Sequence, residues 1–253
     1  MFTALKRWWA RGAGRARRPH FEAVEAWADR SGFRFRKADD GQRFVVEAAS
    51  GGQVLRMEWG PSQRSYIPQS ELRIRMDLNL PGSLQMLVLT LPLMEQLESE
   101  TYERYTQDAQ TVIDMSTPEE MRWLAMFPKI DLLFDKLLRA RFCVLGANPE
   151  WSLAWINGPL GAQLGRAAQD LLSTDTPFVL MTLRGKLYLR MQLADPRPQA
   201  LSQCLEVFDA AAQSAQQITG QIPPSDAEWA STASTAWQTQ IPIDDEATDS
   251  TRF

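Results

Sequence analysis

Hydrophobic and polar residues alternate with a period of two in several short segments of the first third of the chain. The alternating segments are FRFRKA (33–38), RFVVEAA (43–49), VLRMEWG (54–60) and ELRIRMDL (71–78). A fifth segment, LQMLVLT (84–90), is apolar enough for a buried strand. Repeated alternation through short turns predicts an antiparallel meander with one buried face and one solvent-exposed face.

The polar positions of this meander carry both signs of charge. They are Arg34, Arg36, Arg56, Glu58, Glu71, Arg73, Arg75 and Asp77. The arginines have two interpretations, a basic binding stripe or a set of cross-strand ion pairs on a solvated face. Because acidic residues are interleaved with the arginines, ion pairing is the better interpretation.

Apolar residues recur at helical spacing on both sides of the meander. HFEAVEAWADRSG (20–32) has this spacing, and Gly32 is a suitable end for the helix. A charged helical pattern covers residues 92–115. The sequence therefore predicts a helix before the first strand and a longer one after the last strand of the meander.

Two further helices are predicted between residues 116 and 140. In STPEEMRWLAMF (116–127), Thr117 as N-cap and Glu120 three residues later predict a capping box. KIDLLFDKLLRA (129–140) predicts a helix with one apolar face, made of Ile130, Leu133, Phe134 and Leu137.

A second mixed segment begins at residue 141. RFCVLG (141–146) reads as a short strand, and Asn148 before a proline predicts the N-cap of the next helix. PFVLMTL (177–183) and LYLRMQL (187–193) flank a tight turn and predict a hairpin. The closing helix, 196–218, carries an apolar stripe of Leu201, Cys204, Leu205 and Phe208.

These elements predict an α+β fold, in which an antiparallel β-meander with flanking helices precedes a second, helix-rich α+β unit containing a β-hairpin. One continuous sheet and two separate units are both compatible with the pattern, and we favour two units. The expected segments are a basic aromatic tail (1–19), helix plus meander (20–94), a helical connection (95–140), the second unit (141–219) and a disordered acidic tail (220–253).

Few residues suit catalysis or metal binding. Cys143 and Cys204 lie in apolar settings that predict free, buried thiols in a reducing compartment. The only histidine is His20, in the basic tail, so we expect no zinc site, no catalytic residue and no cofactor. Trp151 and Trp155 are four residues apart, and we expect them in the core rather than in a base-stacking site.

Charge is concentrated at the two ends of the chain. Residues 1–20 hold six Lys or Arg and no acid, whereas the whole chain has a formal net charge of −4. Basic and aromatic residues together suit an anionic membrane surface or a protein partner. The candidate binding residues are Phe2, Lys6, Arg7, Trp8, Trp9, Arg11, Arg15, Arg17 and Arg18.

The strand, the Asn-Pro helix start, the G-x-L-x-L hairpin and the closing helix of residues 141–215 resemble a module of uncharacterised bacterial proteins. Similar domains are often attached to membrane-associated proteins, which favours a peripheral membrane role. The resemblance implies no activity and no catalytic residues.

The longest apolar run, at 84–94, is too short to span a bilayer, and no secretory signal peptide is visible, so we expect a cytoplasmic protein that can lie at the inner face of the membrane. The favoured function is a non-enzymatic binding or adaptor protein, membrane-peripheral through its basic N-terminus. One alternative is a small-molecule binder or enzyme with a pocket between the two units. A nucleic-acid binder is the other, and it would need a contiguous basic face that joins the N-terminal tail to the arginines of the sheet.

Overall fold

The computed structural model describes residues 21–38, 41–50, 52–107 and 117–222. Its strands are β1 (Arg34–Lys37), β2 (Phe44–Ser50), β3 (Gln53–Pro61), β4 (Ser70–Asp77), β5 (Met86–Thr90), β6 (Lys129–Ile130), β7 (Phe142–Gly146), β8 (Phe178–Leu183) and β9 (Lys186–Gln192). Each segment that alternates in the sequence forms one of these strands, and the predicted hairpin is β8 and β9.

The nine strands form one antiparallel sheet in the order β1-β2-β3-β4-β9-β8-β5-β7-β6. The predicted α+β class with an antiparallel sheet is therefore confirmed. Strands of the two predicted units are interleaved in this sheet. β4 of the first unit pairs with β9 of the second, and β5 of the first unit lies between β8 and β7 of the second. The sheet itself thus sets no boundary between the units.

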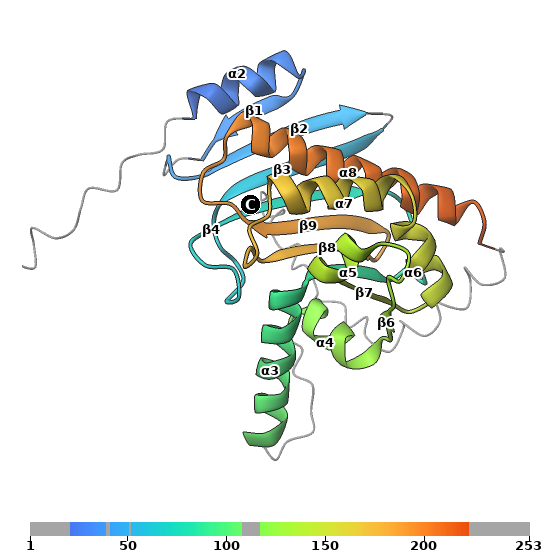
Figure 1. The fold of residues 1–253 in the computed structure, drawn as a ribbon. Helices are drawn as coiled ribbons and strands as arrows, with labels where there is room; N and C mark the ends of the chain where they lie inside the picture. The colour runs from blue at the N-terminus through green and yellow to red at the C-terminus, as the bar shows by residue number, and fades with distance from the viewer. Residues whose placement is uncertain (1–20, 39–40, 51, 108–116, 223–253) are drawn as a thin grey trace, which may run out of the picture.

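Helices cover one face of the sheet completely. They are α2 (Glu22–Arg30), α5 (Lys136–Arg141), α6 (Pro149–Ile156), α7 (Pro159–Asp170) and α8 (Pro198–Thr219). Figure 1 shows α7 and α8 lying across the sheet. We call the apolar layer between these helices and the sheet the first core; it contains Trp155, Phe208 and the inward side chains of every strand from β2 to β9 except β6.

The other face is covered over only part of its width. Helices α3 (Leu91–Gln107) and α4 (Glu119–Met126) pack on β5, β7 and β8 and enclose a second core. Alternation in β8 separates the two cores, because Leu180 belongs to the first, whereas Val179 and Met181 belong to the second. Of strands β1–β4 and β9, only Tyr188 on β9 packs against the second core in the described part of the chain. Helices α3 and α4 therefore leave most of this area uncovered, and the candidate site lies there.

The capping box predicted at Thr117 is wrong. Pro118 is the N-cap of α4, without a side-chain capping bond, and Glu120 is buried with 1% of its surface exposed. The reason is long-range, because Arg64 and Tyr66 of the β3–β4 connection both donate hydrogen bonds to Glu120. A carboxylate held by these two donors is not available to cap its own helix.

The helix predicted over 129–140 begins later than its pattern indicates. Residues 129–130 form the edge strand β6 on β7, so backbone pairing replaces the first helical turn. Asp135 then caps α5 by accepting from the backbone N–H groups of Leu137 (2.8 Å) and Leu138 (3.0 Å). Leu133 and Phe134, predicted on a buried face, are instead 71% and 50% exposed.

Candidate functional site

The uncovered part of the sheet presents a charged surface, which we call the open face. On β1–β4 and β9 the residues that alternate with the first core lie on the opposite face of the sheet. The charged residues of these strands on the open face are Arg34, Arg36, Glu47, Arg56, Glu58, Glu71, Arg73, Arg75, Asp77, Lys186 and Arg190. Seven are cationic and four are acidic, so the open face is formally positive.

Most of the arginines belong to a continuous chain of ion pairs, which we call the ladder. It runs across five strands in the order Arg36, Glu47, Arg56, Glu58, Arg73, Glu71 and Arg190. The separations include 2.7 Å for Arg36–Glu47 and for Arg190–Glu71, and 3.1 Å for Arg73–Glu58. The predicted cross-strand ion pairing is confirmed for Arg36, Arg56 and Arg73, which pair with Glu47 or Glu58 on a neighbouring strand. The ladder begins and ends with arginine, and therefore keeps one positive charge in excess.

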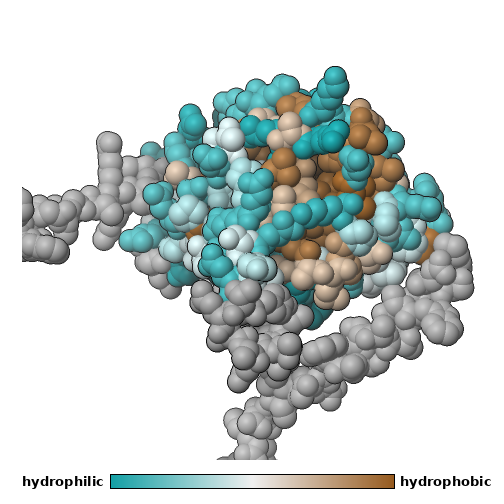
Figure 2. All heavy atoms as spheres, turned by 60° about the horizontal axis from the view of Figure 1, so that its bottom comes forward, coloured by the Kyte–Doolittle hydropathy of each residue, from teal (hydrophilic) through white to brown (hydrophobic). Residues whose placement is uncertain are grey.

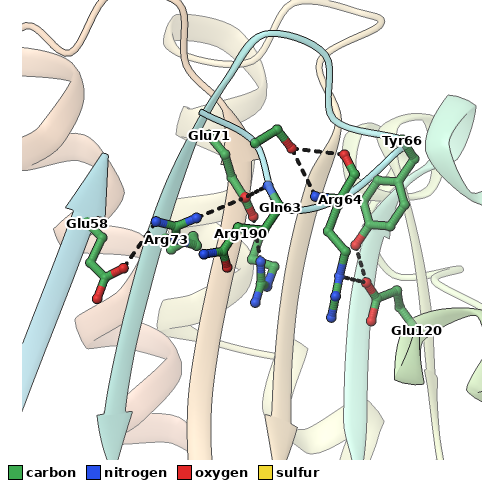
Figure 3. Close-up of polar contacts among 9 residues, drawn as sticks. Glu58, Gln63, Arg64, Tyr66, Glu71, Arg73, Glu120 and Arg190 are labelled. Carbon is green, nitrogen blue, oxygen red and sulfur yellow. Dashed lines mark hydrogen bonds and ion pairs between the residues drawn. The ribbon is translucent and has the colours of Figure 1, made fainter. Parts of the chain in front are cut away.

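Glu71 is the most buried residue of the ladder. Its side chain has no exposed surface, and it accepts from Arg190 at 2.7 Å and from Arg73 at 3.5 Å. The backbone N–H of Gln63 donates to the same carboxylate at 2.9 Å, which ties the β3–β4 connection to the face (Figure 3). A buried charge needs such partners, because without them its desolvation would be strongly destabilising.

The second anchor of the β3–β4 connection is Glu120 on α4. Arg64 Nε donates to Glu120 at 2.9 Å, and the hydroxyl of Tyr66 donates to the same oxygen (Figure 3). Burial raises the pKa of Tyr66, and the charge of Glu120 and its hydrogen bond raise it further. The phenol therefore stays neutral and keeps its proton as a donor. These contacts fix residues 62–69 beside the open face.

Arg75 differs from the other central arginines of the open face because it is outside the ladder. It is exposed, and in the strand register it lies opposite Arg56 on β3 and opposite Tyr188 on β9. Within the described residues its guanidinium makes no hydrogen bond or ion pair within the usual distances. Its charge still acts on its surroundings, notably on the carboxyl of Glu58.

Glu58 shows the electrostatic character of the face. Burial raises its pKa, but the hydrogen bond from Arg56 and the charges of Arg56, Arg73 and Arg75 outweigh this effect, so the net pKa lies below its ordinary value. Glu58 is accordingly ionised at neutral pH. The face is thus a fixed arrangement of full charges rather than a set of neutral polar groups.

A shallow depression of about 100 Å³ lies on the open face over β3, β4 and β9. Its polar lining includes Arg56, Glu58, Arg73, Arg75, Tyr188 and Arg190. Pockets that enclose a whole metabolite usually measure roughly 300–1,000 Å³. The depression can therefore accept one charged group projecting from a larger partner, but it is too small to enclose a metabolite.

Large apolar side chains are also exposed along the segment from the end of α4 to the start of α5, which we call the α4–α5 patch. It consists of Met126, Leu133 and Phe134, which are 63%, 71% and 50% exposed. Figure 2, in which the lower side of Figure 1 comes forward, shows hydrophobic surface gathered on the right of this side. Exposed apolar surface that is contiguous is typical of contact sites for other proteins, and Leu133 and Phe134 are neighbours in the chain.

The two cysteines are free and buried, as predicted. Cys143 belongs to the second core and Cys204 to the first, so the sheet separates them. Burial raises the pKa of Cys143 to about 11 and that of Cys204 to about 12. Both thiols are therefore protonated at neutral pH, which makes them poor nucleophiles.

Within the ranges that the structure covers, no group of three or more His, Cys, Asp or Glu is arranged to hold a metal ion. The helices of the same ranges include none that is long and apolar enough to cross a membrane. Of the two tryptophans predicted in the core, Trp155 is fully buried and Trp151 packs on the first core partly exposed.

The binding residues proposed from the sequence lie outside the described residues. This holds for Phe2, Lys6, Arg7, Trp8, Trp9, Arg11, Arg15, Arg17 and Arg18, and also for His20 and for residues 223–253 of the acidic tail. Sequence reasoning did not include Tyr188 and Arg190 in the candidate surface. The alternation of LYLRMQL could have placed both on the polar face of the hairpin.

Comparisons with known proteins give no match to a family model, to a curated protein or to a solved structure. The strand, Asn-capped helix, hairpin and closing helix of residues 141–215 are present as β7, α6, β8–β9 and α8. Their resemblance to a module of uncharacterised bacterial proteins remains a prediction.

Proposed function

We propose that this protein is a non-enzymatic binding or adaptor protein that contacts an acidic protein partner through the open face. The observation that carries this proposal is the uncovered, positively charged surface of five adjacent strands. The neighbouring strands of the same sheet face are buried under α3 and α4, whereas this area keeps fixed arginines in contact with solvent.

Two further features support a protein as the partner rather than a small molecule or a nucleic acid. The α4–α5 patch supplies exposed apolar surface, as protein contact sites commonly do. The open face also holds ionised carboxylates between its arginines, and these would repel the closely spaced phosphates of a nucleic acid. A partner with separated acidic side chains fits this alternation better.

The open face can be tested with a labelled oligo-glutamate peptide as the probe. We expect fluorescence anisotropy to show binding that weakens as salt rises, because exposed charges are screened. The double variant Arg36→Glu/Arg75→Glu should bind the probe about tenfold more weakly or worse, a loss of ~1.4 kcal/mol or more. Oligo-lysine should not bind.

The matched control carries the same change of charge on the opposite side of the sheet. Lys136→Glu/Arg166→Glu alters exposed residues of α5 and α7 and should keep the affinity for oligo-glutamate within about twofold. Equal weakening by both double variants would refute the open face as the binding surface. Tighter binding of single-stranded DNA than of oligo-glutamate would favour the nucleic-acid alternative.

A peripheral membrane role is a second candidate, and the composition of the N-terminal segment favours it. Six cations and two tryptophans within residues 1–20 suit the surface of an anionic bilayer, where each cation contributes about 1 kcal/mol. In this role the protein would act in the cytoplasm at the inner face of the membrane.

Liposome flotation tests this second candidate directly. We expect the full chain to float with anionic vesicles and not with neutral ones, and to be released by salt. Deletion of residues 1–18 should abolish flotation, whereas deletion of residues 223–253 should not. If the full chain floats with neither kind of vesicle, the membrane role is excluded.

A further inference from the structure

We propose that Arg75, Tyr188 and Arg190 form a subsite for a single carboxylate, supplied by an aspartate or glutamate side chain of the partner. This inference rests on the proposed function, since it specifies which chemical group of the partner enters the depression on the open face. Three observations carry it: the placement of the three residues, their unused donors and the local charge.

The strand register places the three residues together. Arg75 on β4 lies directly opposite Tyr188 on β9, and Arg190 is two residues further along β9 on the same face. Diagonal neighbours of this kind are about 7–8 Å apart at the backbone, within reach of long side chains. All three line the same depression of about 100 Å³.

These side chains hold hydrogen-bond donors that the described residues do not use. The guanidinium of Arg75 has no partner there, and the hydroxyl of Tyr188 makes no hydrogen bond. Arg190 binds Glu71 through one terminal nitrogen, which leaves its other N–H groups available. A guanidinium fork with free N–H groups matches the two oxygens of a carboxylate.

The local charge favours a group with a single negative charge as the ligand of the depression. Four arginines line the depression, namely Arg56, Arg73, Arg75 and Arg190. Glu47, Glu58 and Glu71 pair with three of them, and Glu47 is shared with Arg36 outside the depression. Arg75 is thus the arginine of the depression that has no carboxylate partner among the described residues. A carboxylate neutralises it. A phosphate dianion would place a second negative charge beside ionised Glu58, which disfavours it.

A bound carboxylate would also reduce the repulsion between arginines that the strand register places opposite each other. Arg56 lies opposite Arg75, and Arg73 lies opposite Arg190, whereas directly opposed like charges destabilise a sheet. The ladder glutamates offset this repulsion for Arg56, Arg73 and Arg190. Arg75 has no such carboxylate within the chain segments described, and the partner would provide it.

The test compares single substitutions with the labelled oligo-glutamate as probe. Arg75→Gln should weaken binding about tenfold, and Arg75→Lys by a smaller but measurable factor, because lysine keeps the charge and loses the fork. Arg166→Gln, an exposed position of α7 on the opposite side of the sheet, should keep the affinity within about twofold. Arg75 is exposed and unpaired, so these variants should fold as the parent does, which circular dichroism verifies.

The outcomes separate this inference from the proposed function. If the parent protein does not bind oligo-glutamate, the proposed function fails. If it binds and Arg75→Gln matches Arg166→Gln, the subsite alone is refuted. If a phosphoserine peptide binds more tightly than oligo-glutamate and depends on Arg75, the choice of a carboxylate is wrong. A shift of the Arg75 side-chain NMR signal on adding N-acetyl-glutamate amide would support it.

Discussion

Replacing Glu71 by glutamine is expected to lower the free energy of unfolding by about 3–5 kcal/mol, the usual cost of breaking a buried ion pair. Glu71 is fully buried, and Arg73, Arg190 and the backbone of Gln63 all donate to it. Glutamine keeps the size of the side chain but removes the charge and turns an NH₂ group toward the arginines. Urea unfolding at equilibrium measures the change as a lower midpoint.

Asp77→Asn is the control for this substitution. Asp77 lies on the same strand and pairs with Lys186 at 3.6 Å, but its side chain is 53% exposed. An exposed pair contributes about 0–1 kcal/mol, so this variant should unfold close to the parent midpoint. If Glu71→Gln costs no more than Asp77→Asn, the buried carboxylate does not stabilise the open face.

Trp155→Ala should cause a comparable loss of about 3–5 kcal/mol, by leaving a cavity in the first core. Trp155 has no exposed surface, and its indole N–H donates to the backbone carbonyl of Ala211 on α8 at 3.0 Å. The substitution removes this bond and much of the contact between α6 and α8. Thermal and urea unfolding should both report it.

Trp151→Ala provides the matched comparison on the same helix. Trp151 is one turn away and packs on the first core while part of its surface stays in solvent. Its removal leaves a smaller cavity and should cost clearly less than the removal of Trp155. Equal losses would mean that the two tryptophans are equally important to the core, contrary to their burial.

The local sequence is sufficient to predict the strands of the meander, because alternation reports directly which side of a strand is buried. The register that places Trp59 inside and Glu58 outside follows from this pattern alone. The pairing of β4 with β9, and of β5 with β7 and β8, cannot be predicted from this pattern. It depends on contacts between residues far apart in the chain.

The candidate site was predictable only in part for the same reason. Arg73 and Arg75 occupy equivalent positions in the alternating pattern, yet Arg73 is held by two glutamates and Arg75 has no ion-pair partner among the described residues. Glu120 has the sequence context of a capping residue and is instead bound by Tyr66, 54 residues away. No local pattern distinguishes these cases, because the deciding partners come from other strands and loops.

The position of β9 in the sheet has a consequence for synthesis on the ribosome. The edge of β4 that faces away from β3 can pair only after residues 186–192, which form β9, have been synthesised. In the β4–β9 register, Asp77 lies opposite Lys186. At about 5–20 residues per second, the nascent chain spends on the order of 5–20 s with this edge unpaired. Exposed strand edges promote aggregation, so a translational pause before β9 would lengthen the time during which the nascent chain can aggregate through this edge.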